Sequence, residues 1–380
     1  MFFFLLSASL ALWLIILILP WQPYNTKESW EADPLDQNVF KLDDVTVLIP
    51  ARNEEKVIER TLSSVLQQGD ELKVIVVNDN SDDKTHDIAA RKLAGRGKVI
   101  QADEHPPGWT GKLWALEQGR QHVKTPVTML LDADIELSEG VIKGLRKRLE
   151  YESYSFISLM AKPALAHFWE KVLMPSFIYF FKLLYPFKLA NSDNKLVAAA
   201  AGGCIMAETK VFDEIGGFSS IKDALIDDCT LARNVKDKGF RTWLGLTRSV
   251  KSIRPYSGLA EIWNMVARTA YNQLGYSITL LIVCTVLMVI AFLIPPAGIA
   301  AAVLAMNKIY FQVSMVTIGL MLLTYFPVIR FYRISPFYTL FLPLSGFMFL
   351  MMTWTSAARY WQGEQIRWRG RIEKREPANQ

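Results

Sequence analysis

Two long apolar blocks limit what this chain can fold into. Residues 2–20 form an uncharged apolar run, and residues 274–357 hold several more such runs, whereas residues 41–255 have the mixed composition of a soluble globular domain. A membrane-spanning helix needs about 20 consecutive apolar residues, so both blocks are long enough to enter a bilayer. We therefore expect one soluble α/β domain combined with α-helical transmembrane segments.

The N-terminal run has two interpretations, a retained membrane anchor and a cleaved signal peptide. No basic segment precedes the run, and Trp21-Gln22-Pro23 follows it in place of a small-residue cleavage site. These features favour an anchor over residues 1–22. The polar, acidic and proline-containing residues 23–43 are expected to be a linker.

The C-terminal block predicts several membrane spans. Three apolar segments have the required length, at about 275–294, 309–329 and 337–356. A shorter run at 297–306, after Pro295-Pro296, leaves the number of spans at three or four. If the soluble domain and the basic tail are both cytoplasmic, the passes after residue 273 must be even in number, and three spans do not satisfy this condition.

Charge and cysteine content exclude several classes of protein. The net charge is +5, and the clearest basic cluster, residues 367–371, follows a hydrophobic segment. This arrangement indicates membrane orientation rather than nucleic-acid binding. Three cysteines without paired spacing and four histidines without metal-ligand spacing predict neither a disulfide framework nor a zinc site.

The soluble domain alternates apolar, β-branched runs with helical segments, which predicts a mostly parallel sheet. The runs are residues 45–49, 73–77, 99–100 and 127–131. Three of them end in polar or acidic turns, and Asn53 in the first turn is a candidate helix N-cap. Ligands of such sheets bind outside the carboxyl ends of the strands, so these turns should meet at a nucleotide site.

Asp132-Ala133-Asp134 follows the run at 127–131 directly. Two carboxylates at a strand end suit Mg²⁺ or Mn²⁺ carrying a phosphate ligand, and the alternative is a solvated loop. The glycine patterns of dinucleotide-binding and P-loop proteins are absent from the sequence. The phosphates would then be held by the metal and by a basic group such as Lys112 or Arg52.

A second acidic pair, Asp227-Asp228, opens a helix expected to end at Gly239. Acids at this position act as ordinary caps. A neighbouring pair in a partly apolar pocket would also raise the pKa of one carboxyl group, as a general base requires.

Two further segments each allow more than one interpretation. Residues 166–189 are rich in aromatic residues and lysines. They are either a core helix or an amphipathic segment in the membrane interface that walls an acceptor site. Gly202-Gly203 allows close approach of a ligand or tight internal packing.

The chain resembles the family 2 inverting glycosyltransferases, which have the GT-A fold. The resemblance is carried by a series of motifs in this order: Pro50-Ala51-Arg52-Asn53-Glu54, Asn78-Asp79, Gly111-Lys112, Asp132-Ala133-Asp134, Gly202-Gly203 and Ile226-Asp227-Asp228. The closest resemblance is to the hopene-associated glycosyltransferases, in the phrases PPGWTGKLWA (106–115), AAAAGGC (198–204), ALIDDCTLARNVK (224–236), WLGLTRSVKSIRPY (243–256) and WNMVARTAYNQL (263–274). The resemblance implies a Rossmann-like GT-A domain, a nucleotide-sugar donor, expected to be a UDP-sugar, and a lipid acceptor such as a hopanoid. It also implies a multi-pass protein of the bacterial inner membrane with a cytoplasmic catalytic domain.

The resemblance assigns roles by position. The base and ribose of the nucleotide would contact Pro50, Ala51, Arg52, Glu54 and Asp79, and Lys112 would lie near the base or the diphosphate. Asp132 would contact the ribose or the metal, Asp134 would bind the metal, and Asp228 would be the catalytic base. The acceptor or diphosphate side would include Gly203, Asp227 and Arg268.

Two positions depart from the family's pattern. Asp227 replaces the usual Glu, and only Arg268 remains of the Gln-x-x-Arg-Trp motif that processive relatives carry. Polymer synthesis is therefore disfavoured. The sequence leaves open a polyprenyl-phosphate or carotenoid acceptor in place of a hopanoid, and a non-enzymatic membrane scaffold in place of an enzyme. The expected domains are an anchor (1–22), a linker (23–43), a GT-A domain (44–255), an interfacial helix (256–273), a transmembrane region (274–357) and a basic cytoplasmic tail (358–380).

Overall fold

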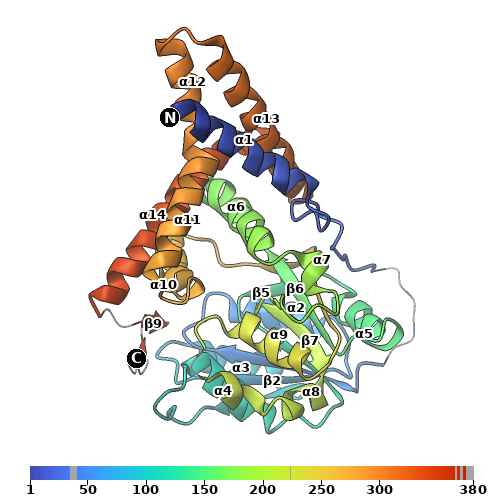
Figure 1. Cartoon of the computed structure of the whole chain (residues 1–380). Coiled ribbons are helices and arrows are strands. Elements are labelled where there is room, and N and C mark those ends of the chain that lie inside the picture. The colour runs from blue at the N-terminus through green and yellow to red at the C-terminus, as the bar shows by residue number, and fades with distance from the viewer. Residues whose placement is uncertain (35–40, 223, 364–365, 369–370, 374–380) are drawn as a thin grey trace. The chain divides into compact units, whose positions relative to one another are not determined.

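The computed structural model describes residues 1–34, 41–222, 224–363, 366–368 and 371–373. The chain divides into two compact units, each made of segments distant in sequence (Figure 1). The helical unit comprises Met1–Lys27, Leu165–Lys188 and Pro255–Glu364, and the sheet unit comprises Glu28–Ala164, Leu189–Arg254 and Gln365–Gln380.

The sheet unit is built on an eight-stranded sheet in the order β3-β2-β1-β4-β7-β6-β8-β5. The strands are β1 (Val45–Ala51), β2 (Lys73–Asn78), β3 (Gly97–Gln101), β4 (Val127–Leu131), β5 (Ile135–Leu137), β6 (Phe156–Lys162), β7 (Cys204–Glu208) and β8 (Thr242–Ser252). Strands β3, β2, β1 and β4 are parallel neighbours, and β6 pairs parallel with β8. Strand β7 runs antiparallel to β4 and β6, and β5 runs antiparallel to β8. This mixed, mostly parallel sheet confirms the predicted fold class.

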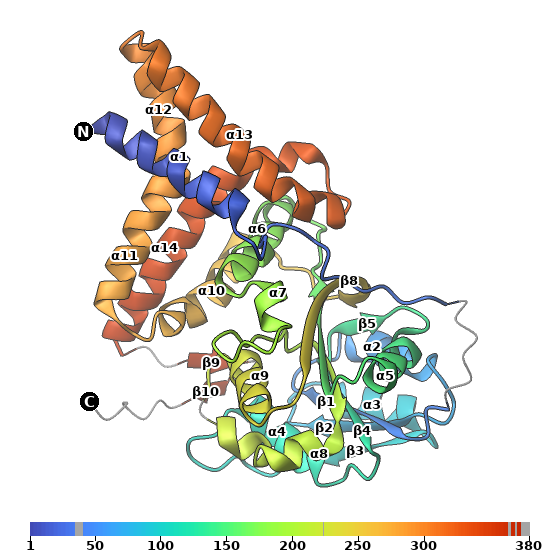
Figure 2. The same cartoon turned by 45° about the vertical axis from the view of Figure 1, so that its right-hand side comes forward.

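Helices cover both faces of the sheet, so the strands at its centre are buried on both sides (Figure 2). Val47 and Ile49 of β1 belong to one hydrophobic core, and Leu48 between them belongs to the other, because successive strand side chains point to opposite faces. The first core includes residues of α2 (Ile58–Leu66), α3 (Thr85–Leu93) and α5 (Val141–Tyr151). The second includes residues of α4 (Gly111–Arg120), α8 (Thr209–Glu214), η1 (Gly217–Ile221) and α9 (Asp227–Asp237). Burial on both faces explains why the strands read as continuous apolar runs.

Two local predictions in the sheet unit are wrong. Asn53 does not cap a helix, because its φ is +53° and α2 begins only at Ile58. Its side-chain oxygen instead accepts a hydrogen bond from the backbone N–H of Asp82 (2.9 Å), and this bond ties the turn after β1 to the turn after β2. The apolar sequence of residues 240–254 predicts two short strands, 240–246 and 248–254. The structure has one strand there, β8, which pairs with both β6 and β5.

Part of the expected linker is packed onto β8. Ser29 forms a β-bridge with Leu246, and the Glu31 carboxylate accepts hydrogen bonds from Nε of Arg248 (2.7 Å) and Oγ of Ser249 (2.7 Å). Burial opposes the charge on Glu31, yet the hydrogen bonds from Ser249 and Arg248 hold the pKa of this carboxyl below its ordinary value. The described linker residues Glu28–Pro34 therefore belong to the sheet unit.

The helical unit contains three helices long and apolar enough to cross a membrane, Ile278–Leu304, Lys308–Phe331 and Pro336–Trp361. The first is continuous through α11 (Ile278–Met288), the π-helical turn η2 (Val289–Leu293) and α12 (Ile294–Leu304). Pro295 and Pro296 lie in the first turn of α12, where a missing backbone N–H is tolerated. The short run at 297–306 is thus largely a continuation of the first span. These helices are consistent with a membrane-associated protein.

The second span is α13 (Lys308–Phe331), and the third combines η3 (Pro336–Phe341) and α14 (Leu342–Trp361). Other helices of this unit are α1 (Phe2–Ile18), which is shorter at 17 residues, α6 (Phe168–Leu184) and α10 (Leu259–Gln273). Helix α6 lies in the segment of uncertain role at 166–189. Its side chains Glu170 and Lys182 are buried, whereas the apolar Phe168 and Leu184 at its two ends are exposed, so both interpretations of this segment stay open. A short helix, α7 (Phe187–Ala190), follows α6 in sequence. Residues 364–365, 369–370 and 374–380 of the predicted basic tail lie outside the described residues, and its described part includes strands β9 (Ile366–Trp368) and β10 (Arg371–Glu373).

Candidate active site

The polar turns predicted to meet do so at the carboxyl ends of β1, β2 and β4. Arg52 after β1 is buried, and its guanidinium donates to the backbone carbonyls of Asp79 (2.5 Å) and Asn80 (2.9 Å) after β2. Nη1 of Arg52 is also 3.9 Å from the fully buried Asp79 carboxylate. Both side chains hold the turn together, and their contact with a nucleotide stays a prediction.

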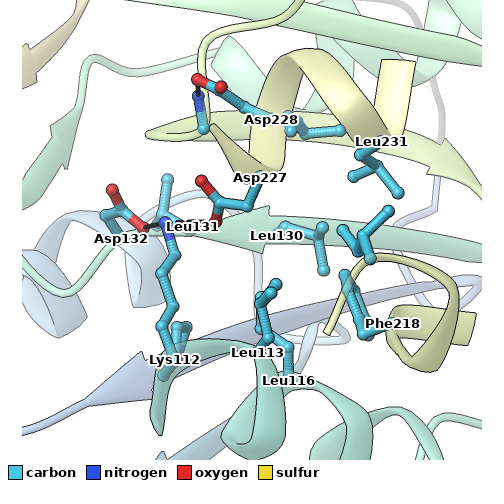
Figure 3. Close-up of a pocket in the computed structure, with 14 residues that line it drawn as sticks. Lys112, Leu113, Leu116, Leu130, Leu131, Asp132, Phe218, Asp227, Asp228 and Leu231 are labelled. Carbon is cyan, nitrogen blue, oxygen red and sulfur yellow. Dashed lines mark hydrogen bonds and ion pairs between the residues drawn. The ribbon is translucent and has the colours of Figure 1, made fainter. Parts of the chain in front are cut away.

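Lys112 stands in the first turn of α4, whose N-terminus is capped by the Thr110 hydroxyl. Its Nζ lies 2.9 Å from Oδ1 of Asp132, directly after β4, and 3.9 Å from Oδ2 of Asp227, the first residue of α9 (Figure 3). Burial opposes the charge on Lys112, but the two carboxylates outweigh burial and raise the pKa of its ammonium group. Lys112 therefore stays positively charged between two strand-end acids.

The Asp228 carboxylate is held by two backbone N–H groups. Gly202 donates to its Oδ2 (3.0 Å) and Cys229 donates to its Oδ1 (2.8 Å). Burial and the neighbouring charge of Asp227 nevertheless raise the pKa of Asp228 from 3.8 to about 6. Gly202 packs closely here, since a Cβ added to it would lie 3.4 Å from Cβ of Asp228 and 3.5 Å from Nζ of Lys112. Asp228 is thus an oriented carboxylate that can take up a proton near neutral pH.

Asp134 has a partner that sequence reasoning missed. Nε of Arg254, two residues after β8, lies 3.3 Å from Oδ2 of Asp134, and Nη2 of Arg254 forms an ion pair with the Glu54 carboxylate. The backbone N–H of Ile253 also donates to the carbonyl of Asp134 (2.9 Å). Only the pairing of β8 with its neighbours brings Arg254 to this edge, and no local pattern around residue 254 signals it.

One pocket is lined by Lys112 and by the carboxylates of Asp132, Asp227 and Asp228, and it has a polar wall and an apolar wall (Figure 3). Its polar wall contains Lys112, Asp132, Asp227 and Asp228 together with the backbone of Gly202. Its apolar wall is formed by Pro50, Leu113, Leu116, Leu130, Leu131, Ile205, Phe218, Ile221 and Leu231. An ammonium group, carboxylates and a carboxyl group with a raised pKa in one pocket suit binding of a phosphate-bearing ligand and transfer of a proton.

The family model "Glycosyl transferase family 2" matches residues 46–216, which include every strand of the large sheet except β8 and the first residue of β1. Residues 46–216 are therefore similar to a family 2 glycosyltransferase domain.

Curated relatives match this chain over a short stretch. A 4,4'-diaponeurosporenoate glycosyltransferase of Staphylococcus aureus (strain bovine RF122 / ET3-1) is 38% identical over 112 residues, which are 30% of this chain and 28% of the relative. The enzyme of the same description from Staphylococcus haemolyticus (strain JCSC1435) is 35% identical over 94 residues, 25% of each chain. The chain therefore spans only about a quarter of the length of these relatives.

Solved structures similar to this chain are more distant in sequence. A mannosyltransferase from Pyrobaculum calidifontis, in complex with GDP-Man and Mn²⁺, has a TM-score of 0.49 and 18% identity and covers 91% of this chain and 95% of its own. A glucosyl-3-phosphoglycerate synthase from Mycobacterium tuberculosis, in complex with Mg²⁺ and UDP, has a TM-score of 0.42 and 15% identity and covers 61% and 79%.

The structure brings some of the expected site residues together and leaves others apart. Pro50, Lys112, Asp132, Asp227 and Asp228 line one pocket. The Ala51 side chain lies in the sheet core, so a nucleotide could contact only its backbone. The Gly203 carbonyl accepts a hydrogen bond from the N–H of Asp132 (3.1 Å). Arg268 lies on α10 of the helical unit, and its role stays a prediction.

The donor set of the glycosyltransferase domain fits a divalent metal that arrives with a diphosphate. The described part of the chain holds no group of three His, Cys, Asp or Glu side chains that could bind a metal alone. Mg²⁺ is commonly bound by only one or two carboxylates, with substrate phosphates as further ligands. Asp132 and Asp134 at the end of β4 supply two carboxylates of this kind, each now paired with a cation.

Proposed function

We propose that this protein is a membrane-bound inverting glycosyltransferase that moves a sugar from a nucleotide sugar to a hydroxyl group of a lipid. The observation that carries the proposal is the Asp228 carboxylate. Two backbone N–H groups orient it, its pKa is raised to about 6, and it lies in one pocket with Lys112 within a family 2 domain. A positioned carboxylate with a pKa just below neutral suits general-base catalysis.

In the proposed reaction the acceptor oxygen attacks the anomeric carbon of the sugar. Asp228 takes the proton from this hydroxyl group, while the bond between the anomeric carbon and the diphosphate oxygen breaks. The electron pair of that bond leaves with the nucleoside diphosphate, and the configuration at the anomeric carbon inverts. A positioned base contributes about 10²–10⁴-fold to such a rate.

The leaving diphosphate develops negative charge. Among the described residues that line the pocket, Lys112 carries the positive charge. Its raised pKa keeps it charged throughout the pH range of the reaction. Preorganised charge of this type is usually the largest contribution to catalysis. Asp134 and Asp132 would hold Mg²⁺ or Mn²⁺, which supplies further positive charge to the diphosphate. The proposed residues for the base and ribose are Pro50, Ala51, Arg52, Glu54 and Asp79.

A lipid acceptor is supported by the three helices long and apolar enough to cross a membrane. The sequence resemblance favours a hopanoid or a related polar lipid, with the catalytic domain on the cytoplasmic side of the bacterial inner membrane. A carotenoid acid is the second candidate, because the curated relatives are 4,4'-diaponeurosporenoate glycosyltransferases. The incomplete motif around Arg268 disfavours processive polymer synthesis.

The test is release of nucleoside diphosphate by the full chain in detergent. Panels of UDP- and GDP-sugars are supplied with Mn²⁺, Mg²⁺ or EDTA, with and without hopanoid or carotenoid acceptors. Release that needs metal and rises with one acceptor supports the proposal and identifies both substrates. Asp228→Asn should abolish release, whereas Asp237→Asn, at the exposed end of the same helix, should not. No release with any donor from folded protein would refute the proposal.

A further inference from the structure

Arg254 joins two acidic side chains at the edge of the sheet. It follows β8, and its guanidinium lies between Glu54, which follows β1, and Asp134, which follows β4. The Glu54 side chain is 6% exposed, that of Asp134 is 19% exposed and that of Arg254 is 31% exposed. Charge pairs with this degree of burial are weakly screened by salt. Arg254 therefore sets the position of Asp134 while no donor is bound.

The charges at this edge do not balance. Among the described residues, six carboxylates lie here against three cations, Arg52, Lys112 and Arg254; the carboxylates are those of Glu54, Asp79, Asp132, Asp134, Asp227 and Asp228. A divalent cation would reduce this excess of negative charge. However, a metal bound to the Asp134 carboxylate would lie close to the Arg254 guanidinium, whose Nε is 3.3 Å from Oδ2 of Asp134, and the two positive charges would repel each other. Metal binding and the Arg254–Asp134 pair therefore compete.

A diphosphate would relieve this competition. Guanidinium groups bind phosphate oxygens through paired N–H donors at least as well as they bind carboxylates. Arg254 could then keep its partner Glu54 and exchange Asp134 for a phosphate oxygen. The two ligands would each make binding of the other more favourable, which is a coupling free energy between them.

We propose that Arg254 is a positioning residue that occupies Asp134 in the absence of donor and releases it when a divalent metal and a diphosphate bind together. This inference rests on the proposed metal-assisted donor site. It predicts that the metal alone binds weakly and that a diphosphate strengthens metal binding through Arg254. The site would thereby reject free metal and accept the metal–diphosphate pair.

The experiment measures Mn²⁺ binding to the full chain in detergent by electron paramagnetic resonance, with and without inorganic pyrophosphate. Arg254→Met should bind Mn²⁺ alone about tenfold more tightly than the wild type, and the gain from pyrophosphate should fall about tenfold, a typical size for such coupling. Arg248→Met is the matched control. Arg248 lies within β8, the strand that Arg254 follows. Its side chain is 33% exposed and forms an ion pair with Glu31, which is not one of the acids of the site. This control should bind Mn²⁺ like the wild type.

The outcomes separate the two proposals. If the wild type binds Mn²⁺ with pyrophosphate but Arg254→Met shows unchanged affinity and unchanged coupling, the role of Arg254 is refuted and the donor site stands. If the wild type binds no Mn²⁺ even with pyrophosphate, the metal-assisted donor site itself is refuted. Arg254→Lys keeps the charge but is too short to join both acids, so its Mn²⁺ affinity should lie between those of wild type and Arg254→Met. If Arg254→Met does not fold, unchanged affinity and coupling in the lysine variant would overturn the inference.

Discussion

Replacing Asp228 with asparagine should stabilise this protein at neutral and basic pH while it abolishes turnover. The pKa of Asp228 is raised from 3.8 to about 6, so the folded state binds the proton more tightly than the unfolded state does. Stability is therefore lost as the pH rises from about 3.8 to about 6. Above that range the cost of ionised Asp228 reaches about 3 kcal/mol, since a tenfold change in proton affinity is worth about 1.4 kcal/mol.

Asparagine removes this charge but not without cost. Gly202 and Cys229 each donate to one oxygen of Asp228, and an amide offers only one oxygen, so one hydrogen bond is lost at about 1 kcal/mol. The net gain at pH 8 is then about 2 kcal/mol. For a domain of this size that corresponds to a rise in Tm of about 4–8 °C. At pH 4 Asp228 is protonated in the folded state, and the gain should vanish or reverse.

The assay is thermal unfolding of the full chain in detergent at pH 8 and pH 4, followed by intrinsic fluorescence, beside a turnover measurement. Asp237→Asn serves as the control, because Asp237 is exposed at the other end of α9. A Tm gain of equal size at both pH values would refute the reasoning, because it would not come from the Asp228 charge. Turnover close to wild type in Asp228→Asn would refute the assignment of the base.

Three other substitutions test the site and its support. Lys112 faces Asp132, and its charge lowers the pKa of Asp228. In Lys112→Met this cation is lost, so nucleotide affinity measured by calorimetry should fall about 10–100-fold. The pKa of Asp228 should rise, and the pH at which the rate rises should move upward with it. Gly202→Ala adds a methyl group with ordinary contacts to Asp228 and Lys112, so Tm should change little while kcat/KM falls about tenfold, the effect of one misfitting methyl group. In Glu31→Gln the charged hydrogen bonds to β8 are lost. Because the folded pKa of Glu31 is lowered, this variant should be about 1–2 kcal/mol less stable at pH 7, and the difference should disappear as the pH falls below 4.5; a constant difference would argue against the charge.

Much of the sheet unit could be predicted because its signals are local. Strands such as β4 are buried on both faces and therefore appear as short apolar runs, and the turns at their ends are polar. The start of α9 at Asp227 was also predictable, since acids are favoured in the first turn of a helix. The start of α2 was not, because Asn53 uses its side chain to bind the neighbouring turn rather than its own helix. Local sequence does not reveal which of two possible partners an amide will choose.

The sequence by itself determined the alternation of strands and helices, the acidic turn after β4, the acid pair that opens α9 and the division into apolar and mixed regions. These features depend on side-chain periodicity and on residues adjacent in the chain. Only the tertiary structure decided that Lys112 lies between Asp132 and Asp227, that Gly202 holds Asp228, and that Arg254 pairs with Asp134. Each of these contacts joins elements far apart in sequence, and their geometry follows from the order and register of strands in the sheet, which no local pattern encodes.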